Sequence, residues 1–361
     1  MNSRRWWGNR RGQEYWQWRG CTILQAFAAS AVALTTIGCM APLDEAQLRD
    51  RATLCLQRGM RFPDNPAVRA QAMEAAGEEL GASAIEYLLE GTRDEHPGVR
   101  FAACMAIGSL GDPAFIEKIR PMANDADGSV RIGVYYALDR INDGTYRRAW
   151  LEAMRNDPNA TVRGNAVMAL GLLGNPNVIP LLKRVSVEDS DTSVRLQAIE
   201  AMALLGDEDA ISRLAYDAFG GVGDRQPFAL LALRRAKGND VIAHLRNRLE
   251  SAPLLETRLA AARVLAMRDD NQGYPLALAS LTWNSPQSVP NDSKENQIMR
   301  ARSMAAMALG EMHDRHALEP LRLCMENNDD PRIQLAAARA ILSILRGASP
   351  TSAGQVSPSG S

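Results

Sequence analysis

The sequence predicts an all-α protein, an α-solenoid of about eight to nine stacked two-helix repeats. Three observations lead to this prediction. One residue position recurs at nearly constant intervals, apolar residues of helical period surround each recurrence, and a glycine followed by aspartate or asparagine closes many of these patterns. Self-similarity at a period of about 30 residues is typical of solenoids, in which each repeat buries its apolar face only against its neighbours.

The recurring position is occupied by arginine in seven repeats and by glutamine in two. Seven of the eight intervals between these markers are 31 or 32 residues, and the remaining one is 44. The markers are Arg69, Arg100, Arg131, Arg163, Arg195, Gln226, Arg258, Arg302 and Gln334. Such regularity indicates a repeated structural unit, which we expect to be two short antiparallel helices.

The stretch 161–176 shows the repeat most clearly. Val162, Ala166 and Leu170 recur at helical spacing, so they lie on one face of a predicted helix. Gly174 is expected to end this helix, and the following Asn-Pro dipeptide is expected to cap and begin the next one. The second helix of each repeat is apolar at adjacent helical positions, and neither helix can bury its apolar face alone.

The pattern Val-Arg-x-x-Ala-x-x-Ala-Leu-Gly, with its short period and Gly-Asp break, resembles HEAT-like repeats of the short type, named after phycobilisome lyases. The resemblance covers roughly residues 64–346. It implies that each marker arginine and an aspartate in the preceding loop form a structural ladder between repeats, and Asp125, Asp157 and Asp189 precede their markers by six residues. The expected ladder arginines are Arg69, Arg100, Arg131, Arg163, Arg195, Arg258 and Arg302.

The N-terminal segment 1–38 has the layout of an export signal. Five arginines precede an apolar stretch without charged residues, which ends in Gly38-Cys39. This ending resembles a bacterial lipobox, which implies lipidation at Cys39 and a mature protein held on the periplasmic side of a membrane in the cell envelope. An uncleaved signal anchor and a cytoplasmic protein are the alternatives, and the long leader also leaves open a start codon further downstream.

Three segments flank or interrupt the repeats. Residues 39–63 are expected to form a short tether and an N-terminal capping helix, and residues 347–361 are rich in Gly, Ser and Pro and are expected to be disordered. The 12 extra residues in the 44-residue interval fall near 284–296, which we predict to be a polar loop. This loop is either a contact surface or a solvated insertion that the solenoid tolerates.

Charge and cysteine content exclude several classes of protein. Without the leader the chain has 36 basic and 41 acidic residues, so no general nucleic-acid binding is expected. Cys55, Cys104 and Cys324 are irregularly spaced, and two of them lie in apolar helical patterns. They are expected to be buried thiols rather than a disulfide framework.

Basic residues recur at polar positions of the second helices in four consecutive repeats. In the family that this chain resembles, the second helices line the concave side, the usual binding surface of a solenoid. We expect a basic stripe that binds an acidic protein segment, a phosphate-bearing polymer or a lipid head group; an ordinary solvated face is the alternative. The stripe consists of Arg147, Arg148, Arg155, Lys183, Arg184, Arg213, Arg246 and Arg248.

No enzyme signature stands out. The chain has no Gly-rich phosphate loop, no nucleophile elbow and no metalloprotease helix. Deoxyhypusine hydroxylases, which share this repeat type, carry paired His-Glu dipeptides that bind iron, whereas this chain has only the reversed Glu95-His96. His313 and His316 flank an arginine and lack a matching cluster of ligands. We therefore predict no catalytic residue, no metal site and no cofactor.

The sequence thus favours a non-catalytic scaffold or adaptor for protein–protein interactions, held at a bacterial membrane by a lipid anchor. Two alternatives remain: a lyase-like or chromophore-handling HEAT-repeat enzyme, and an envelope structural protein that binds an anionic polymer. The lyases of this repeat class act on tetrapyrrole chromophores inside cyanobacterial cells, which fits poorly with an exported lipoprotein. The partner, the membrane and leaflet, and the oligomeric state do not follow from the residues.

Overall fold

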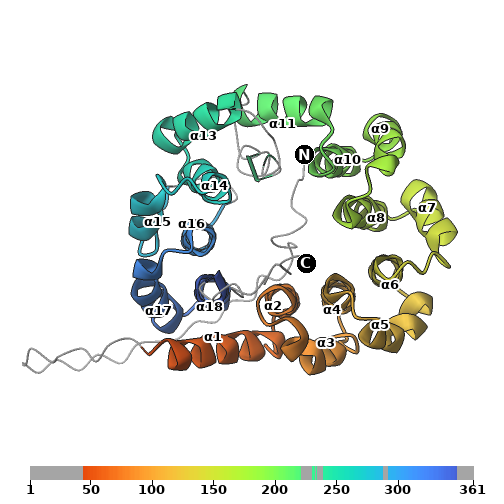
Figure 1. Ribbon diagram of the computed structural model, residues 1–361, viewed down its shortest axis with the longest axis horizontal. Coiled ribbons are helices and arrows are strands. Elements are labelled where there is room, and N and C mark those ends of the chain that lie inside the picture. The colour runs from red at the N-terminus through yellow and green to blue at the C-terminus, as the bar shows by residue number, and fades with distance from the viewer. Residues whose placement is uncertain (1–43, 221–229, 232, 234–238, 288–291, 348–361) are drawn as a thin grey trace, which may run out of the picture.

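The computed structural model describes residues 44–220, 230–231, 233, 239–287 and 292–347. The predicted signal peptide 1–38, Cys39, the marker Gln226 and the tail from residue 348 lie outside this part of the chain. In the described part, seventeen α-helices alternate between an outer and an inner layer (Figure 1). The prediction of an all-α solenoid of paired helices is confirmed.

The outer layer holds α1 and the second helix of each repeat, and four of these helices, α5, α9, α11 and α13, follow a Gly-Asp or Gly-Asn break. The outer helices are α1 (Glu45–Met60), α3 (Ile85–Gly91), α5 (Pro113–Ile119), α7 (Arg147–Asn156), α9 (Ile179–Glu188), α11 (Glu208–Gly220), α13 (Asn239–Ser251), α15 (Tyr274–Ser280) and α17 (Leu318–Glu326).

The inner layer holds the helices that carry the marker residues. They are α2 (Pro66–Glu79), α4 (Pro97–Leu110), α6 (Gly128–Arg140), α8 (Ala160–Leu173), α10 (Thr192–Leu204), α14 (Leu255–Ala266), α16 (Lys294–Met312) and α18 (Pro331–Gly347).

Local sequence signals set the helix boundaries. Gly174 adopts a left-handed conformation with φ of 78° at the end of α8, and Gly111 does the same with φ of 69° at the end of α4. The Asp112 side chain then accepts a hydrogen bond of 2.9 Å from the Ala114 backbone NH, which caps the start of α5. Glycine ends one helix and Asp or Asn caps the next, as the sequence predicts at these positions.

Small residues decide which helices lie inside. A Cβ placed on Gly108 would lie 2.8 Å from Ala137 Cα, and one on Gly310 would lie 2.9 Å from Ala340 Cα. Both contacts join an inner helix to the next inner helix, so their backbones approach closely. Helices that pack this closely form the layer nearer the centre of the ring. The outer helices have larger apolar side chains, such as Trp150, and form the layer farther from the centre.

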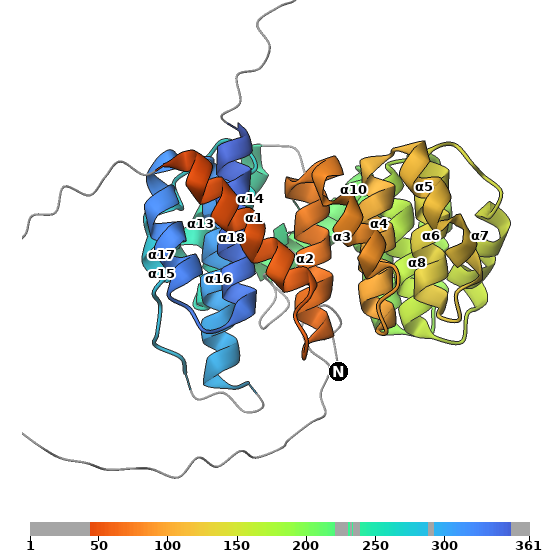
Figure 2. The same ribbon diagram turned by 90° about the horizontal axis from the view of Figure 1, so that it is seen from below.

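The two ends of the solenoid meet and close a ring. The last inner helix, α18, lies beside α2 and packs against α1, which crosses it on the outside (Figure 2). Leu48 and Leu56 of α1 are buried at this junction. The capping helix that the sequence predicts therefore covers the far end of the same chain as well as its own first repeat.

Polar contacts reinforce the apolar packing at the junction. Arg49 Nη2 donates to the Leu345 carbonyl oxygen at 2.9 Å, and Arg51 Nη1 lies 3.0 Å from Glu326 Oε1. These contacts join residues almost 300 positions apart, so they hold the first outer helix against the last repeat.

The predicted polar loop near 284–296 is shorter than expected. Helix α16 begins at Lys294, eight residues before its marker Arg302, so the loop prediction is wrong for its last three residues. Residues 288–291 lie outside the described part. Part of the insertion extends the helix, and Gln297 Nε2 of that helix donates to the Gln287 carbonyl oxygen at 2.9 Å.

Substitution of Gly59 tests the closure of the ring. A Cβ at Gly59 would lie 2.5 Å from Leu335 Cδ2 of α18 and 3.0 Å from Ala72 Cβ of α2. We expect Gly59→Leu to separate α1 from α18, to lower the free energy of unfolding by about 1–3 kcal/mol and to speed amide hydrogen exchange in both helices. Gly108→Leu, which disturbs two inner helices away from the junction, is the control. Unchanged exchange in α1 and α18 of the Gly59 variant would contradict closure through this contact.

Candidate functional site

Marker arginines bond to the loop that precedes their helix, and Arg69, Arg100, Arg163 and Arg302 also bond to the loop of the following repeat. Arg163 Nε and Nη2 donate to the two carboxylate oxygens of Asp189, each at 2.8 Å, and its Nη1 donates to the Asp157 carbonyl oxygen at 2.8 Å. The side chains of Arg163 and Asp189 are only 10% and 6% exposed. A bidentate pair this well shielded fixes both distance and orientation between two repeats.

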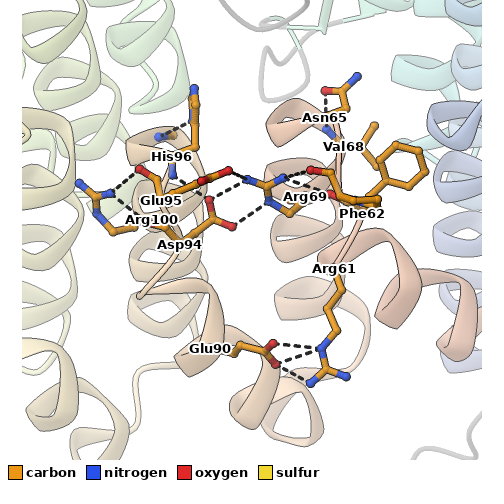
Figure 3. A network of polar contacts seen from close by, with 12 residues as sticks. Arg61, Phe62, Asn65, Val68, Arg69, Glu90, Asp94, Glu95, His96 and Arg100 are labelled. Carbon is orange, nitrogen blue, oxygen red and sulfur yellow. Dashed lines mark hydrogen bonds and ion pairs between the residues drawn. The ribbon is translucent and has the colours of Figure 1, made fainter.

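The same geometry recurs at the start of the ring. Arg69 pairs with both carboxylate oxygens of Asp94 at 2.8 Å, and Arg100 donates to the Asp94 carbonyl oxygen at 2.9 Å (Figure 3). Arg100 in turn pairs with the Asp125 carboxylate at 2.9–3.0 Å. Each aspartate thus accepts side-chain bonds from one marker and a backbone bond from the next marker.

This arrangement differs from the expected ladder in one respect. The preceding loop contributes a carbonyl oxygen, and the carboxylate comes from the following loop, 25 or 26 residues after the arginine. The six-residue spacing between Asp189 and Arg195 therefore marks the bond from Arg195 Nη1 to the Asp189 carbonyl oxygen. The carboxylate is left free to bind the arginine of the repeat before.

The ladder changes its chemistry in the last repeats. Arg302 Nη1 donates to Asn328 Oδ1 at 2.7 Å, so an amide replaces the carboxylate. The marker Gln334 donates from Nε2 to the Asn328 carbonyl oxygen at 2.6 Å, so an amide also replaces the guanidinium. The positions are kept while Asn328 and Gln334 carry no charge, which indicates that these bonds set geometry more than charge.

The ion pairs stabilise the charged form of the aspartates. Burial alone would raise the pKa of the Asp94 carboxyl, but hydrogen bonds from Arg69 and from the His96 backbone NH lower that pKa below its ordinary value. The Asp189 carboxyl has a lowered pKa for the same reasons, with Arg163 as its partner. The ladder is therefore fully ionised at neutral pH.

The predicted basic stripe lies on the outer wall of the ring and not on a concave face. Its residues belong to α7, α9, α11 and α13, all of which are outer helices (Figure 1). The expected placement is wrong because the small-residue faces of the marker helices draw those helices inward. The concave surface belongs to the first helix of each repeat.

Half of the stripe is neutralised or engaged by neighbouring side chains. Arg147 forms an ion pair with Asp139, Lys183 Nζ lies 3.0 Å from Asp207 Oδ2, and Arg246 Nε lies 2.8 Å from Asp270 Oδ2. Arg248 is half-buried and also has an interaction. The remaining four arginines are exposed and form no ion pair within the described part of the chain. They are Arg148, Arg155, Arg184 and Arg213.

Exposed apolar side chains lie among these unpaired arginines. Val187 of α9 and Tyr216 of α11 are each 76% exposed, the highest values among the large apolar residues described. Each follows an unpaired arginine by three residues, so Arg184 and Val187 share one helix face, as do Arg213 and Tyr216. We define the outer patch as Arg148, Arg155, Arg184, Val187, Arg213 and Tyr216.

A second polar site, which the sequence analysis missed, lies on the inner layer. A cavity of about 360 Å³ is lined by residues of α2, α14, α16 and α18 only. These four helices follow one another around the inner layer, where α16 lies between α14 and α18 and α18 lies beside α2 (Figure 1). We call the cavity the luminal cleft, and its charged residues are Glu78, Glu79, Arg263, Glu311, Arg339 and Arg346. The sequence contains one signal for this cleft. Charged residues occur on these marker helices, where most repeats have small or apolar residues.

The cysteines and histidines have structural surroundings. Burial raises the pKa of the Cys104 thiol to about 12 and that of Cys324 to about 11, so both thiols are protonated at neutral pH. His96 Nδ1 accepts a hydrogen bond from the Gly98 NH as the cap of α4, and His316 contacts Asp314 at 2.7 Å. Within the described residues, no cluster of three or more His, Cys, Asp or Glu side chains is arranged to hold a metal ion. None of the helices described is both long and apolar enough to span a bilayer.

Comparison with protein families identifies the class. The HEAT-repeat model matches residues 54–141 and 148–216, and the model for the PBS lyase HEAT-like repeat matches residues 301–327. Together with the paired helices, these matches show that the chain is a HEAT-like repeat protein. No functionally curated protein matches it at a significant level.

Two solved structures are similar to parts of this chain. Human deoxyhypusine hydroxylase in complex with glycerol is 18% identical, with a TM-score of 0.37, over 75% of this chain and 99% of that one. The complex of CpcE and CpcF of phycocyanin lyase from Nostoc sp. PCC7120 is 17% identical, with a TM-score of 0.39, over 76% of this chain and all of that one.

Truncation of one marker tests the structural role of the ladder. We expect Arg163→Ala to lower the free energy of unfolding by about 3 kcal/mol, because it leaves the Asp189 carboxylate buried without its partner. Arg184→Ala, on the exposed wall of the neighbouring helix α9, should change the free energy by less than about 0.5 kcal/mol. Urea denaturation of both variants measures the difference, and equal losses would refute the assignment.

Proposed function

We propose that this chain is a non-catalytic scaffold that binds an acidic protein segment on its outer wall and is tethered to a bacterial membrane by a lipid on Cys39. The observation that carries the binding surface is the outer patch, where four unpaired arginines surround two exposed apolar side chains. Arginine and tyrosine are enriched in protein interfaces, and unpaired surface charge steers an oppositely charged partner into contact.

The arrangement of the patch suits an extended or helical segment. Its six residues belong to α7, α9 and α11, which follow one another along the outer wall (Figure 1). In the neighbouring repeats, Arg120 forms an ion pair with Asp143 and Arg246 forms one with Asp270. A partner with alternating acidic and apolar residues would satisfy the guanidiniums and cover Val187 and Tyr216 together.

The proposed tether holds the ring close to the membrane. Cys39 precedes Glu45, the first residue of α1, by six residues, which span at most about 20 Å when fully extended. One lipid signal of this kind would place the ring where it can gather partners of the envelope. The export signal 1–38 supports this part of the proposal from the sequence.

Charge reversal tests the outer patch. The chain with Arg184→Glu and Arg213→Glu should lose a protein partner that the unmodified chain captures from solubilised envelope. A matched control carries Arg93→Glu and Arg140→Glu, which reverse two exposed arginines outside the patch. Mass spectrometry identifies the partner, and retention of that partner by the patch variant would refute the binding surface.

Other outcomes of the same capture point to the alternative functions. A coloured small molecule without a protein partner would favour a chromophore-handling enzyme of the lyase type. Enrichment of an anionic envelope polymer would favour a structural role. In either case the scaffold proposal fails.

Replacement of the proposed lipid-bearing residue tests the tether. We expect Cys39→Ser to move the protein from the membrane fraction to the soluble fraction and to abolish incorporation of a labelled fatty acid. Cys55→Ser, which alters a thiol inside α1, serves as the control and should behave like the unmodified chain. Persistent fatty-acid labelling of the Cys39 variant would rule out the anchor.

A further inference from the structure

The luminal cleft is lined by three glutamates and three arginines, and each arginine contacts acceptors of neighbouring helices. Arg263 Nη2 lies 2.9 Å from Glu311 Oε1, and Arg339 forms an ion pair with Glu78. Arg346 Nη1 donates to the Glu78 carbonyl oxygen. The three arginines of the cleft are thus engaged with acceptors of α2 and α16, and they leave no guanidinium free for an anionic ligand.

Glu79 lacks the hydrogen bonds that its burial requires. Its side chain is 4% exposed, and within the described part of the chain its Oε2 atom accepts no hydrogen bond. The nearest cationic atoms are Arg346 Nη2, 3.4 Å from Oε2, and Arg339 Nε, 3.7 Å from Oε1. A buried carboxylate oxygen without a hydrogen-bond donor lowers the stability of the fold. A ligand in the cleft that donates to Glu79 Oε2 would remove this cost.

The local charge favours a cation as that donor. The lining itself holds three glutamates and three arginines. Glu74 lies outside the lining, one helical turn before Glu78 on α2, and its carboxyl interacts electrostatically with Glu78 and Arg339, so it adds a fourth acidic group beside the cleft. Glu79 is the last residue of α2 and Glu311 lies in the last turn of α16. Both are at the negative end of a helix dipole, which further favours positive charge at this end of the cleft.

The remaining walls suit a short hydrocarbon. Met307, Gly310 and Ala340 line the cavity between the charged groups, and Ser343 adds one hydroxyl. Thioether and methyl groups offer an apolar surface along which methylene groups can lie. An apolar wall offers no ligands to a metal ion, and the described residues form no metal-binding cluster.

We propose that the luminal cleft binds a small aliphatic amine, whose ammonium group donates to Glu79 Oε2 while its methylene groups lie along Met307 and Ala340. This site is independent of the outer patch, because it lies on the inner layer and shares no residue with it. The ring would then carry a ligand site inside and a partner surface outside.

The acidity of Glu74 predicts how binding depends on pH. Burial, aided by the negative charge of Glu78 and opposed by Arg339, raises the pKa of the Glu74 carboxyl to about 7. The charged groups that act on Glu74 are Glu78 and Arg339. The other charged groups that line the cleft beside them are Glu79, Arg263, Glu311 and Arg346. Because Glu74 gains its negative charge as the pH rises through 7, an amine should bind more tightly at pH 8 than at pH 6.

Isothermal titration of the full chain with butane-1,4-diamine tests the proposal. We expect saturable binding of the diamine, no binding of the neutral butane-1,4-diol, and at least tenfold weaker diamine binding by Glu79→Gln. Glu152→Gln, which removes a carboxylate from the outer wall, is the matched control and should bind as the unmodified chain does.

Several results would overturn the amine site. They are equal binding of diol and diamine, undiminished binding by the Glu79 variant, or no heat of binding at either pH. In the last case ordered water alone would satisfy Glu79. Should Glu79→Gln fold poorly, Ser343→Leu, which fills the cleft from α18, should also abolish binding. Capture of a protein partner by the outer patch should be the same in all these variants, so failure here is distinct from failure of the scaffold.

Discussion

The close approach of consecutive inner helices is the constraint on which the rest of the structure depends. Gly108 against Ala137 and Gly310 against Ala340 leave no room for a larger side chain, so these helix pairs are fixed at short separation. The outer helices fill the wider spaces behind them. The difference in spacing between the layers curves the array, and sustained curvature brings α18 back to α1 and α2. Ring closure, the outer patch and the luminal cleft all follow from this difference.

The arginine ladder supplies the precision that packing alone does not. Apolar helix faces tolerate small shifts, whereas a bidentate Arg163–Asp189 pair fixes the angle between two repeats. Toward the end of the ring the amides of Asn328 and Gln334 replace a carboxylate and a guanidinium of the ladder, and further ion pairs lie nearby. Arg300 binds Asp292 at 2.6 Å and Glu256 at 3.2 Å, which ties the insertion and α14 to α16.

The sequence predicts the local elements well and the large-scale shape poorly. The repeat period, the stop at Gly174 and the paired helices depend on neighbouring residues, and the structure shows them where the pattern predicts. The contact of Gly59 with Leu335 depends instead on the rotation between consecutive repeats, added up over the whole array. No local sequence pattern predicts that total rotation. The basic residues were placed on the wrong wall because the prediction took the orientation from a family resemblance. The orientation is decided by the small-residue faces of the marker helices, and these faces are present in the sequence.

The closure of the ring changes how the protein can come apart. In an open repeat array the terminal repeats have one neighbour each, so they fray first and unfolding spreads inward. Here α1 and α18 are each other's neighbours, so the first and last of the described helices each pack on a further repeat. Opening must break two interfaces at once, which makes local fraying expensive and unfolding more cooperative than in a linear array. The same closure fixes the number of repeats, since an added or lost unit would leave the ring either strained or gapped.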